Sequence, residues 1–223
     1  MVVRAKKGPA PDAAEADACA KILSAAGEVF AEQGFEGATI RAITERAGVN
    51  VAAVNYYFRD KAELYTQVLG DACLARAAFR EVMAGADGPP EEKLRNLVSC
   101  FLKYLLDPGL PAWKRRLMAR EMTNPTTALD ELVEKNIRPM REEFLLPTLR
   151  ELTDGCLNRR QLSLIGASIM GQCLYFLQSR PIIERLNPDF KTGKAEIEEL
   201  AEHITRFSLA AIAELTRQAR RSV

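Results

Sequence analysis

Histidine is almost absent from this 223-residue sequence, which contains a single copy, His203. A metal site would therefore need cysteines or carboxylates at ligand spacing, and none is evident. The five cysteines are widely spread and include no CxxC pair, a pattern typical of reduced thiols rather than of disulfides or zinc ligands. No glycine-rich phosphate loop is present, and no triad of nucleophile, base and orienting residue can be assembled. We expect no metal, no cofactor and no enzyme activity.

Long apolar runs are also lacking. No stretch approaches the ~20 apolar residues that cross a bilayer, and the basic residues near the N-terminus are not followed by the apolar segment of a secretory signal. We therefore expect a cytoplasmic protein with no membrane partner. Residues 1–16 contain prolines and three basic residues, and we expect them to form a flexible basic arm.

Excess positive charge is missing as well. The formal net charge is +1, and residues 1–70 hold eight Lys and Arg against nine Asp and Glu. This balance excludes a generally basic nucleic-acid-binding chain. Apolar residues make up 48% of the sequence, which is typical of a folded globular protein with a sizeable core.

The most informative stretch that is present covers residues 39–64, TIRAITERAGVNVAAVNYYFRDKAEL. Thr39 stands where an N-cap is expected, and Gly48 can take the left-handed conformation that ends a helix. Asn50 can cap a second short helix over residues 51–57, with Val54 and Phe58 facing inward. Asp60, three residues before Glu63, predicts the start of a third helix. This pattern indicates a helix-turn-helix whose second helix is short enough for a DNA major groove.

The sequence AGVNVAAVNYYFRDKAELY resembles the signature of the TetR family of bacterial transcription regulators. The preceding segment, ILSAAGEVFAEQGFEGATIRAITERAG, is similar to the first two helices of that family in residue type and spacing. The resemblance covers roughly residues 20–66. It implies a three-helix DNA-binding domain, and we assign this domain to residues 17–66.

Chemistry and family position together suggest which side chains contact DNA. A hydroxyl at a helix N-terminus suits a phosphate, and arginine suits a phosphate or guanine. Small apolar side chains can approach a thymine methyl, and an asparagine amide matches the edge of adenine. The resemblance implies phosphate contacts for the aromatic pair and for the lysine after it, although packing at a helix end is the alternative for the tyrosines. The candidates are Thr39, Arg41, Asn50, Val51, Ala52, Asn55, Tyr56, Tyr57 and Lys61.

The remainder of the chain shows helical periodicity, with no strand-length alternating run and no internal repeat. We expect one helix from Lys61 to about Met83, and an interrupted or kinked helix around Pro139 and Pro147. The predicted fold is all-α. It consists of the N-terminal helix-turn-helix domain and a helical effector-binding and dimerisation domain over residues 67–223.

Two late helices carry wide apolar stripes, which can build the chain's own core or a subunit interface. In the TetR family the corresponding helices form a four-helix bundle with a second subunit. This resemblance implies a homodimer, as a pseudo-palindromic operator requires. The candidate interface residues are Leu162, Ile165, Ile169, Cys173, Ile204, Phe207, Ala211 and Ile212.

Residues 117–132, LMAREMTNPTTALDEL, resemble the branch of the family that contains the CecR-type regulators. Family members bind a small-molecule effector among their C-terminal helices, and large side chains here are candidates for that cavity or for ordinary core packing. Two charged residues in this apolar region need partners, either across helices or on a ligand. The candidates are Phe101, Tyr104, Trp113, Met118, Arg120, Glu121, Met122, Met140, Phe144 and Tyr175.

We therefore expect a DNA-binding transcriptional regulator, with double-stranded operator DNA, a second copy of the chain and a small-molecule effector as partners. A TetR-type repressor released by its effector is the favoured form. The alternatives are a ligand-responsive activator, or a helical adaptor or ligand-binding protein with a relic helix-turn-helix.

Overall fold

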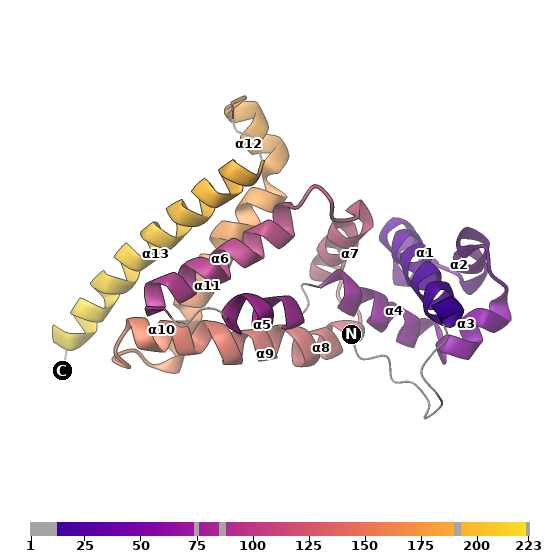
Figure 1. The fold of residues 1–223 in the computed structure, drawn as a ribbon, viewed down its shortest axis with the longest axis horizontal. Helices are drawn as coiled ribbons and strands as arrows, with labels where there is room; N and C mark the ends of the chain where they lie inside the picture. The colour runs from indigo at the N-terminus through magenta and orange to yellow at the C-terminus, as the bar shows by residue number, and fades with distance from the viewer. Residues whose placement is uncertain (1–12, 74–75, 85–87, 190–192, 222–223) are drawn as a thin grey trace. The chain divides into compact units, whose positions relative to one another are not determined.

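The computed structural model describes residues 13–73, 76–84, 88–189 and 193–221. The described residues form helices joined by short turns, and they contain no strand (Figure 1). The expected all-α class is confirmed. Residues 1–12 of the proposed basic arm lie outside the described residues, and residues 13–16 begin the first helix.

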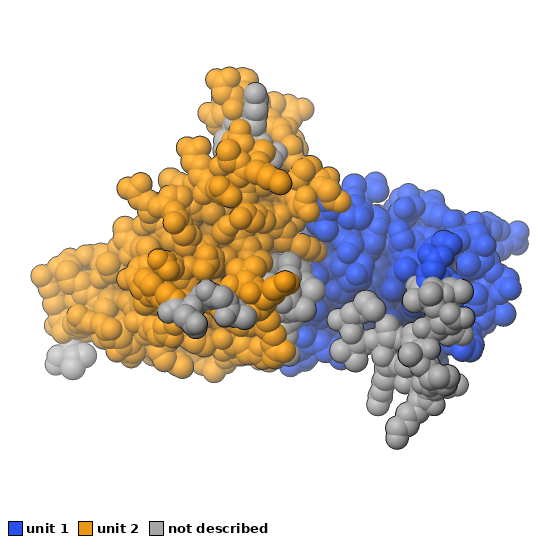
Figure 2. Space-filling view, viewed as in Figure 1, with its two compact units in different colours: residues 1–75, 110–137 blue, residues 76–109, 138–223 orange. Residues whose placement is uncertain are grey.

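Contacts divide the chain into two compact units, which Figure 2 colours separately. The first unit contains residues 1–75 and 110–137, and the second contains residues 76–109 and 138–223. The first unit is therefore larger than the three-helix domain expected over residues 17–66, because two later helices pack onto it. Its elements are α1 (Ala13–Gly37), α2 (Ile40–Ala47), α3 (Val51–Tyr57), α4 (Lys61–Ala72), α7 (Ala112–Thr123), α8 (Ala128–Leu132) and η1 (Val133–Ile137).

The core of the first unit joins the helix-turn-helix to α7 and α8. Phe30 from α1 meets the edge of Tyr65 from α4, with 4.8 Å between ring centroids. Leu117 from α7 is fully buried in the same cluster. Residue 27 of α1 is glycine, and the Trp113 ring of α7 lies directly over it, so that an added Cβ would stand 2.5 Å from the ring. The absence of a side chain at this point allows α1 and α7 to approach closely.

The first helix changes direction at Gly34, which has φ 76° and ψ 175°. Glycine suits this position, since a residue with a Cβ adopts such backbone angles only with strain. One further turn follows to Gly37, and α2 then starts after Thr39.

The predicted helix from Lys61 to about Met83 is wrong as a single element. The helix α4 ends at Ala72 because Cys73 takes an extended backbone, with φ −84° and ψ 147°. A separate helix, α5 (Arg76–Ala84), follows in the second unit. The two apolar stretches belong to different cores: Leu69 is buried in the first unit, whereas Phe79 stacks on Phe144 in the second.

The second unit is built around the packing of α6 against α13, with α10 and α11 completing its core. Pro90 is the first residue of α6, the position where proline costs no hydrogen bond. Asn158 and Gln161 form a capping box at the start of α11. The elements are α5, α6 (Pro90–Leu106), α9 (Arg138–Met140), η2 (Arg141–Leu145), α10 (Leu146–Leu152), α11 (Arg159–Gln178), α12 (Arg180–Leu186) and α13 (Lys194–Arg221).

Two π-helical stretches, η1 and η2, flank the short α9 that contains Pro139. Proline lacks an N–H and collides with the carbonyl four residues earlier, and a local change of helix type accommodates it. The interruption expected near Pro139 is thus confirmed. Across the described ranges, no single helix has the length and apolar character to cross a bilayer; the bent pair α11 and α12, at 72°, passes that test by length and composition alone.

The contact between Trp113 and Gly27 gives the first prediction. We expect Gly27→Ala to lower the free energy of unfolding by about 1–3 kcal/mol, because the new methyl group collides with the indole ring. The control is Gly70→Ala in α4, where an added Cβ meets nothing within 4 Å. This change should raise stability by about 0.5–1 kcal/mol through helix propensity. Urea unfolding measures the free energy of unfolding of both variants. An equal increase in stability for the two variants would contradict the close packing of α7 on α1.

Candidate nucleic-acid interface

Two side-chain caps and one glycine fix the helix-turn-helix. The Thr39 hydroxyl accepts a hydrogen bond from the Ala42 N–H at 3.1 Å, and the Asn50 side-chain oxygen accepts one from the Ala53 N–H at 2.9 Å. Gly48 lies between them with φ 67°, in the left-handed region, and donates its N–H to carbonyls at the end of α2. All of these were predicted from the sequence. They fix the end of α2, the turn and the start of α3, which is the pattern of a helix-turn-helix.

One face of α3 packs inward and the other is exposed to solvent. Val54 and the following Phe58 are each 1% exposed, as predicted. The opposite face presents Val51 at 46% and Tyr56 at 72% exposure, together with the exposed Ala52 and Asn55. Tyr57 is half-buried and meets the Tyr56 ring edge-to-face, with centroids 5.0 Å apart. Exposed apolar, amide and aromatic groups on one short helix provide the chemistry that reads base edges.

The arginine of α2 is exposed but paired. The Arg41 side chain is 86% exposed, and its Nε donates to the Glu45 carboxylate at 2.8 Å. Arg46 behaves differently, because its guanidinium lies 2.9 Å from Glu32 and 3.8 Å from Glu28 and so ties α2 to α1. Arg41 is therefore the cation of α2 that can turn toward a phosphate, after it leaves Glu45.

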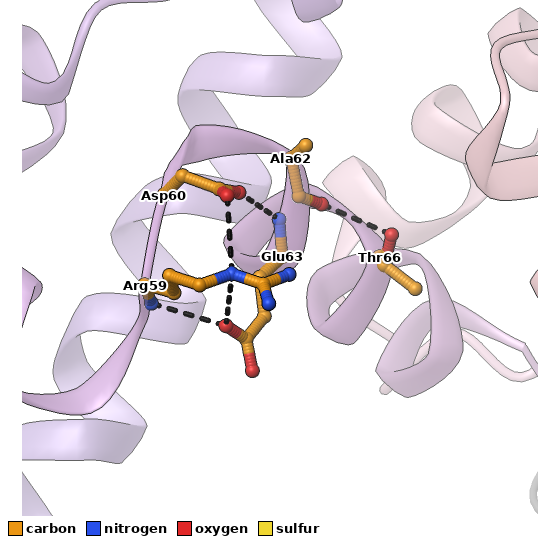
Figure 3. A network of polar contacts seen from close by, with 5 residues as sticks. All are labelled: Arg59, Asp60, Ala62, Glu63 and Thr66. Atoms are coloured by element: carbon orange, nitrogen blue, oxygen red, sulfur yellow. Dashed lines mark hydrogen bonds and ion pairs between the residues drawn. The ribbon is translucent and has the colours of Figure 1, made fainter.

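Figure 3 shows the polar network at the start of α4. The Asp60 carboxylate accepts the Glu63 N–H at 2.8 Å, and this hydrogen bond, with the nearby Arg59, holds the pKa of Asp60 below its usual value. The Arg59 side chain is 82% exposed and lies 3.4 Å from the Asp60 carboxylate. Arg59 therefore has a local acidic partner.

The ammonium group of Lys61 contacts the protein's own backbone. Its Nζ donates to the carbonyl oxygens of Phe35 at 2.9 Å, Ala38 at 3.1 Å and Glu36 at 3.5 Å. It also lies 4.6 Å from the centroid of the Phe35 ring. The ammonium group thus binds the chain's own backbone, in contrast to the role that the family resemblance implied.

The candidate interface residues of α11 and α13 divide into two groups. Phe207 is 61% exposed and Ala211 is exposed, as an interface requires. The other six are buried in the core of their own unit, and Ile165, Ile169 and Ile212 among them also line the groove between α11 and α13 that is described below. These six are Leu162, Ile165, Ile169, Cys173, Ile204 and Ile212.

The exposed apolar surface on these helices lies beside that buried stripe. A groove of about 640 Å³ runs between α11 and α13 and is lined by Leu164, Phe207 and Leu215 among others. Leu164 is 60% exposed and Leu215 is 42% exposed. Leu215 belongs to the periodic apolar stripe of the last helix, whereas sequence periodicity missed Leu164, because α11 is apolar on more than one face.

The candidate effector residues are distributed over both units. Trp113, Met118, Arg120, Glu121 and Met122 lie in the first unit, whereas Phe101, Tyr104, Met140, Phe144 and Tyr175 lie in the second. None of them lines the groove between α11 and α13. Met122 and Tyr175 are both 51% exposed, and Trp113 is occupied by its contact with Gly27.

The two charged candidates have partners within the protein. Glu121 is fully buried and accepts hydrogen bonds from the Tyr65 hydroxyl at 2.6 Å and from the Thr126 N–H and hydroxyl at 2.8 and 3.0 Å. Burial, followed by this hydrogen bond to Glu121, raises the pKa of Tyr65. The guanidinium of Arg120 approaches the backbone at Gly34 and donates to the Gln33 carbonyl at 3.5 Å. Pairing across helices therefore accounts for both charges, and sequence reasoning missed Tyr65 as the partner.

Comparison with known families agrees with this geometry. The TetR family of bacterial regulatory proteins matches residues 22–68, and the C-terminal domain of the HTH-type transcriptional dual regulator CecR matches residues 90–212. The second match covers more than half of the chain. This chain belongs to the TetR family and is CecR-like.

Two curated relatives are transcriptional regulators. CecR of Shigella flexneri is 27% identical over 168 residues, which are 70% of this chain and 74% of that protein. The probable HTH-type transcriptional regulator YttP of Bacillus subtilis is 27% identical over 133 residues, 59% of this chain and 62% of YttP. The chain thus spans less than two thirds of the length of YttP.

A solved structure shows the same fold. The fatty acid degradation regulator FadR from Bacillus halodurans aligns with a TM-score of 0.59 and 20% identity, over 90% of this chain and 97% of that one. This likeness shows the fold alone. The two family matches support the prediction of a DNA-binding transcriptional regulator. Its family is one of regulators rather than of enzymes. Within the described ranges, no group of three His, Cys, Asp or Glu side chains is placed to hold a metal ion.

The Arg41–Glu45 pair gives a second prediction. We expect Glu45→Gln to raise affinity for random duplex DNA severalfold and to steepen its salt dependence, because Arg41 is released for a phosphate. The control is Glu91→Gln in α6, which changes the net charge equally. Fluorescence anisotropy at several salt concentrations measures both. Equal affinities for the two variants would show that Arg41 does not contact DNA.

The Tyr65–Glu121 hydrogen bond gives a third prediction. Because the pKa of Tyr65 is raised in the folded protein, the unfolded chain loses this proton first as pH rises above the ordinary value of 10.0. The stabilisation is present below that pH and is lost above it. We expect Tyr65→Phe to lower the free energy of unfolding by about 1–2 kcal/mol at neutral pH and to reduce the loss of stability above about pH 10. Urea unfolding across this range tests it, and identical pH profiles for variant and parent would contradict it.

Proposed function

We propose that this regulator is a cytoplasmic homodimeric repressor, which binds a pseudo-palindromic operator and leaves it when a small molecule binds. The observation that carries the proposal is the exposed face of α3, with Val54 and Phe58 buried behind it. An operator contact gives this face a partner. The proposed contact residues are Thr39, Arg41, Asn50, Val51, Ala52, Asn55, Tyr56 and Tyr57.

The groove between α11 and α13 supports the homodimer. Leu164, Phe207 and Leu215 are large apolar side chains exposed along it, and a second copy would remove them from water. Two copies also double the number of phosphate contacts. This matters because each helix-turn-helix domain has little excess positive charge. In this proposal Leu164, Phe207, Ala211 and Leu215 carry the interface. Of the six buried candidates, Ile165, Ile169 and Ile212 line the floor of the same groove.

For the effector, we propose that the helices of the second unit hold the ligand. Phe101, Tyr104 and Phe144 are half-buried side chains of that unit. A ligand that favours one of two conformations of the dimer would change the spacing of its two helix-turn-helix domains. The difference between its affinities for the two conformations provides the free energy for release from DNA.

A second candidate function is a regulator that also activates transcription. The CecR relative is described as a dual regulator. The same DNA surface serves both modes, and transcription from a promoter carrying the selected site distinguishes them: repression by this protein supports the first proposal, and stimulation supports the second.

The base-reading role of α3 gives a fourth prediction. Selection from a random duplex pool should yield a symmetric consensus for the parent protein. We expect Asn55→Ala to relax preference at one position of each half-site, because a well-placed contact with a base is worth about 1–3 kcal/mol. The control is Arg59→Ala, which removes a nearby exposed side chain and should keep the consensus.

An unchanged consensus for Asn55→Ala would remove this residue from the interface. Failure of the parent to select any DNA sequence would contradict the repressor proposal and favour a helical adaptor with a relic helix-turn-helix.

The groove gives a fifth prediction. We expect Phe207→Glu to convert a dimer to monomers, because two buried carboxylates without partners cost several kcal/mol. The control is Leu186→Glu in α12, another exposed apolar residue that does not line the groove, at 71% exposure. Sedimentation velocity measures the oligomeric state, and a dimeric Phe207→Glu would place the interface elsewhere.

A further inference from the structure

The junction between α1 and α2 determines how the helix-turn-helix follows the first helix. Gly34 ends the regular part of α1, and the Ala38 N–H returns to the Gly34 carbonyl at 3.2 Å. Thr39 then caps α2. Carbonyl groups at a helix end have no partner within the helix, and the negative end of the helix dipole lies there. This junction therefore needs donors from elsewhere in the unit.

Two cations from different helices supply these donors. Lys61, the first residue of α4, directs its Nζ to the carbonyls of Phe35, Glu36 and Ala38. Since an ammonium group has three N–H donors, a contact with phosphate would compete with these bonds. Arg120 of α7 contacts the same junction. It donates to the carbonyl of Gln33, the residue that precedes Gly34. Its guanidinium lies so close to Gly34 that an added Cβ would be 2.4 Å from the nearest nitrogen.

A buried carboxylate fixes the two cation-bearing helices to each other. Glu121 follows Arg120 in α7 and accepts the Tyr65 hydroxyl from α4, four residues after Lys61. Neither oxygen of this fully buried side chain lacks a donor, because Thr126 supplies the others. The positions of Lys61 and Arg120 are thus coupled through one hydrogen bond.

We propose that Lys61 and Arg120 are positioning residues for DNA recognition, which act by clamping the carbonyl end of α1 and not by contacting DNA. The clamp holds the α1–α2 junction in the one geometry that presents α2 and α3 to the major groove. It also gives the Ala119-Arg120-Glu121 segment a role: it attaches α7 to the DNA-reading helices. The effect on DNA recognition rests on the proposed function, whereas the contacts of Lys61 and Arg120 are those described above.

The salt dependence of operator affinity separates positioning from phosphate binding. We expect Lys61→Met and Arg120→Met each to weaken operator affinity about tenfold, as when the competent fraction of the protein falls to a tenth. The slope of log affinity against log salt should stay at the parent value, because no phosphate contact is lost. The matched variant is Arg41→Met, which removes a proposed phosphate contact and should reduce the slope by about 0.9 per contact.

A reduced slope for Lys61→Met would overturn the proposal and assign this lysine to a phosphate. Parent-like affinity for both Met variants would also overturn it. Amide hydrogen exchange of residues 39–57 in the free variants gives a readout that needs no DNA: we expect faster exchange than in the parent, and unchanged exchange would contradict a clamp. If Lys61→Met does not fold, Lys61→Gln keeps a donor for the carbonyls and is measured in the same way.

Failure of the parent to select DNA would count against the proposed function. The exchange experiment would still decide whether the clamp orders the junction.

Discussion

Carbonyl groups at the end of α1 are the constraint on which the DNA-reading unit depends. The regular part of α1 ends at Gly34, which leaves these groups without helical partners, at the negative end of the helix dipole. Lys61 and Arg120 satisfy them from α4 and α7, and Glu121 fixes those helices to each other. The helix-turn-helix is therefore not a self-contained three-helix module, because its geometry depends on a helix that lies more than 50 residues later in the sequence.

The chemistry of the DNA surface follows from this arrangement. With Val54 and Phe58 buried, α3 directs its polar and small apolar side chains outward. Cations of the unit such as Arg46, Lys61 and Arg120 bind carboxylates or carbonyls, so few remain for phosphates. Because the electrostatic affinity of one helix-turn-helix domain for DNA is limited, two domains in a dimer bind an operator more tightly. The exposed apolar groove of α11 and α13 offers a surface for dimerisation.

Much of the local structure could be predicted from the sequence, because it depends on neighbouring residues. The caps at Thr39, Asn50 and Asp60 each involve a contact three residues away, and the sequence carries that signal directly. The change of direction at Gly34 was predictable for the same reason.

Features that depend on tertiary contacts were not predictable. The partner of Glu121 lies 56 residues earlier, at Tyr65, and nothing in the local pattern indicates it. The break after Ala72 arises because α4 and α5 pack in different cores. On α11 and α13 the apolar residues surround much of each helix, so that periodicity did not separate buried from exposed apolar residues and missed Leu164. Similarly, the three backbone carbonyls that accept hydrogen bonds from Lys61 lie more than 20 residues earlier in the sequence, and no local pattern indicates them.

The central claim is that two copies of this chain present α3 to one operator. Footprinting on the duplex upstream of its own gene, at fixed salt and with the stoichiometry measured in parallel, tests it most directly. The account predicts a protected pseudo-palindrome with half-sites about 34–36 Å apart or a multiple of that spacing, occupied by an even number of subunits. A protected site without symmetry that is occupied by one subunit would contradict it.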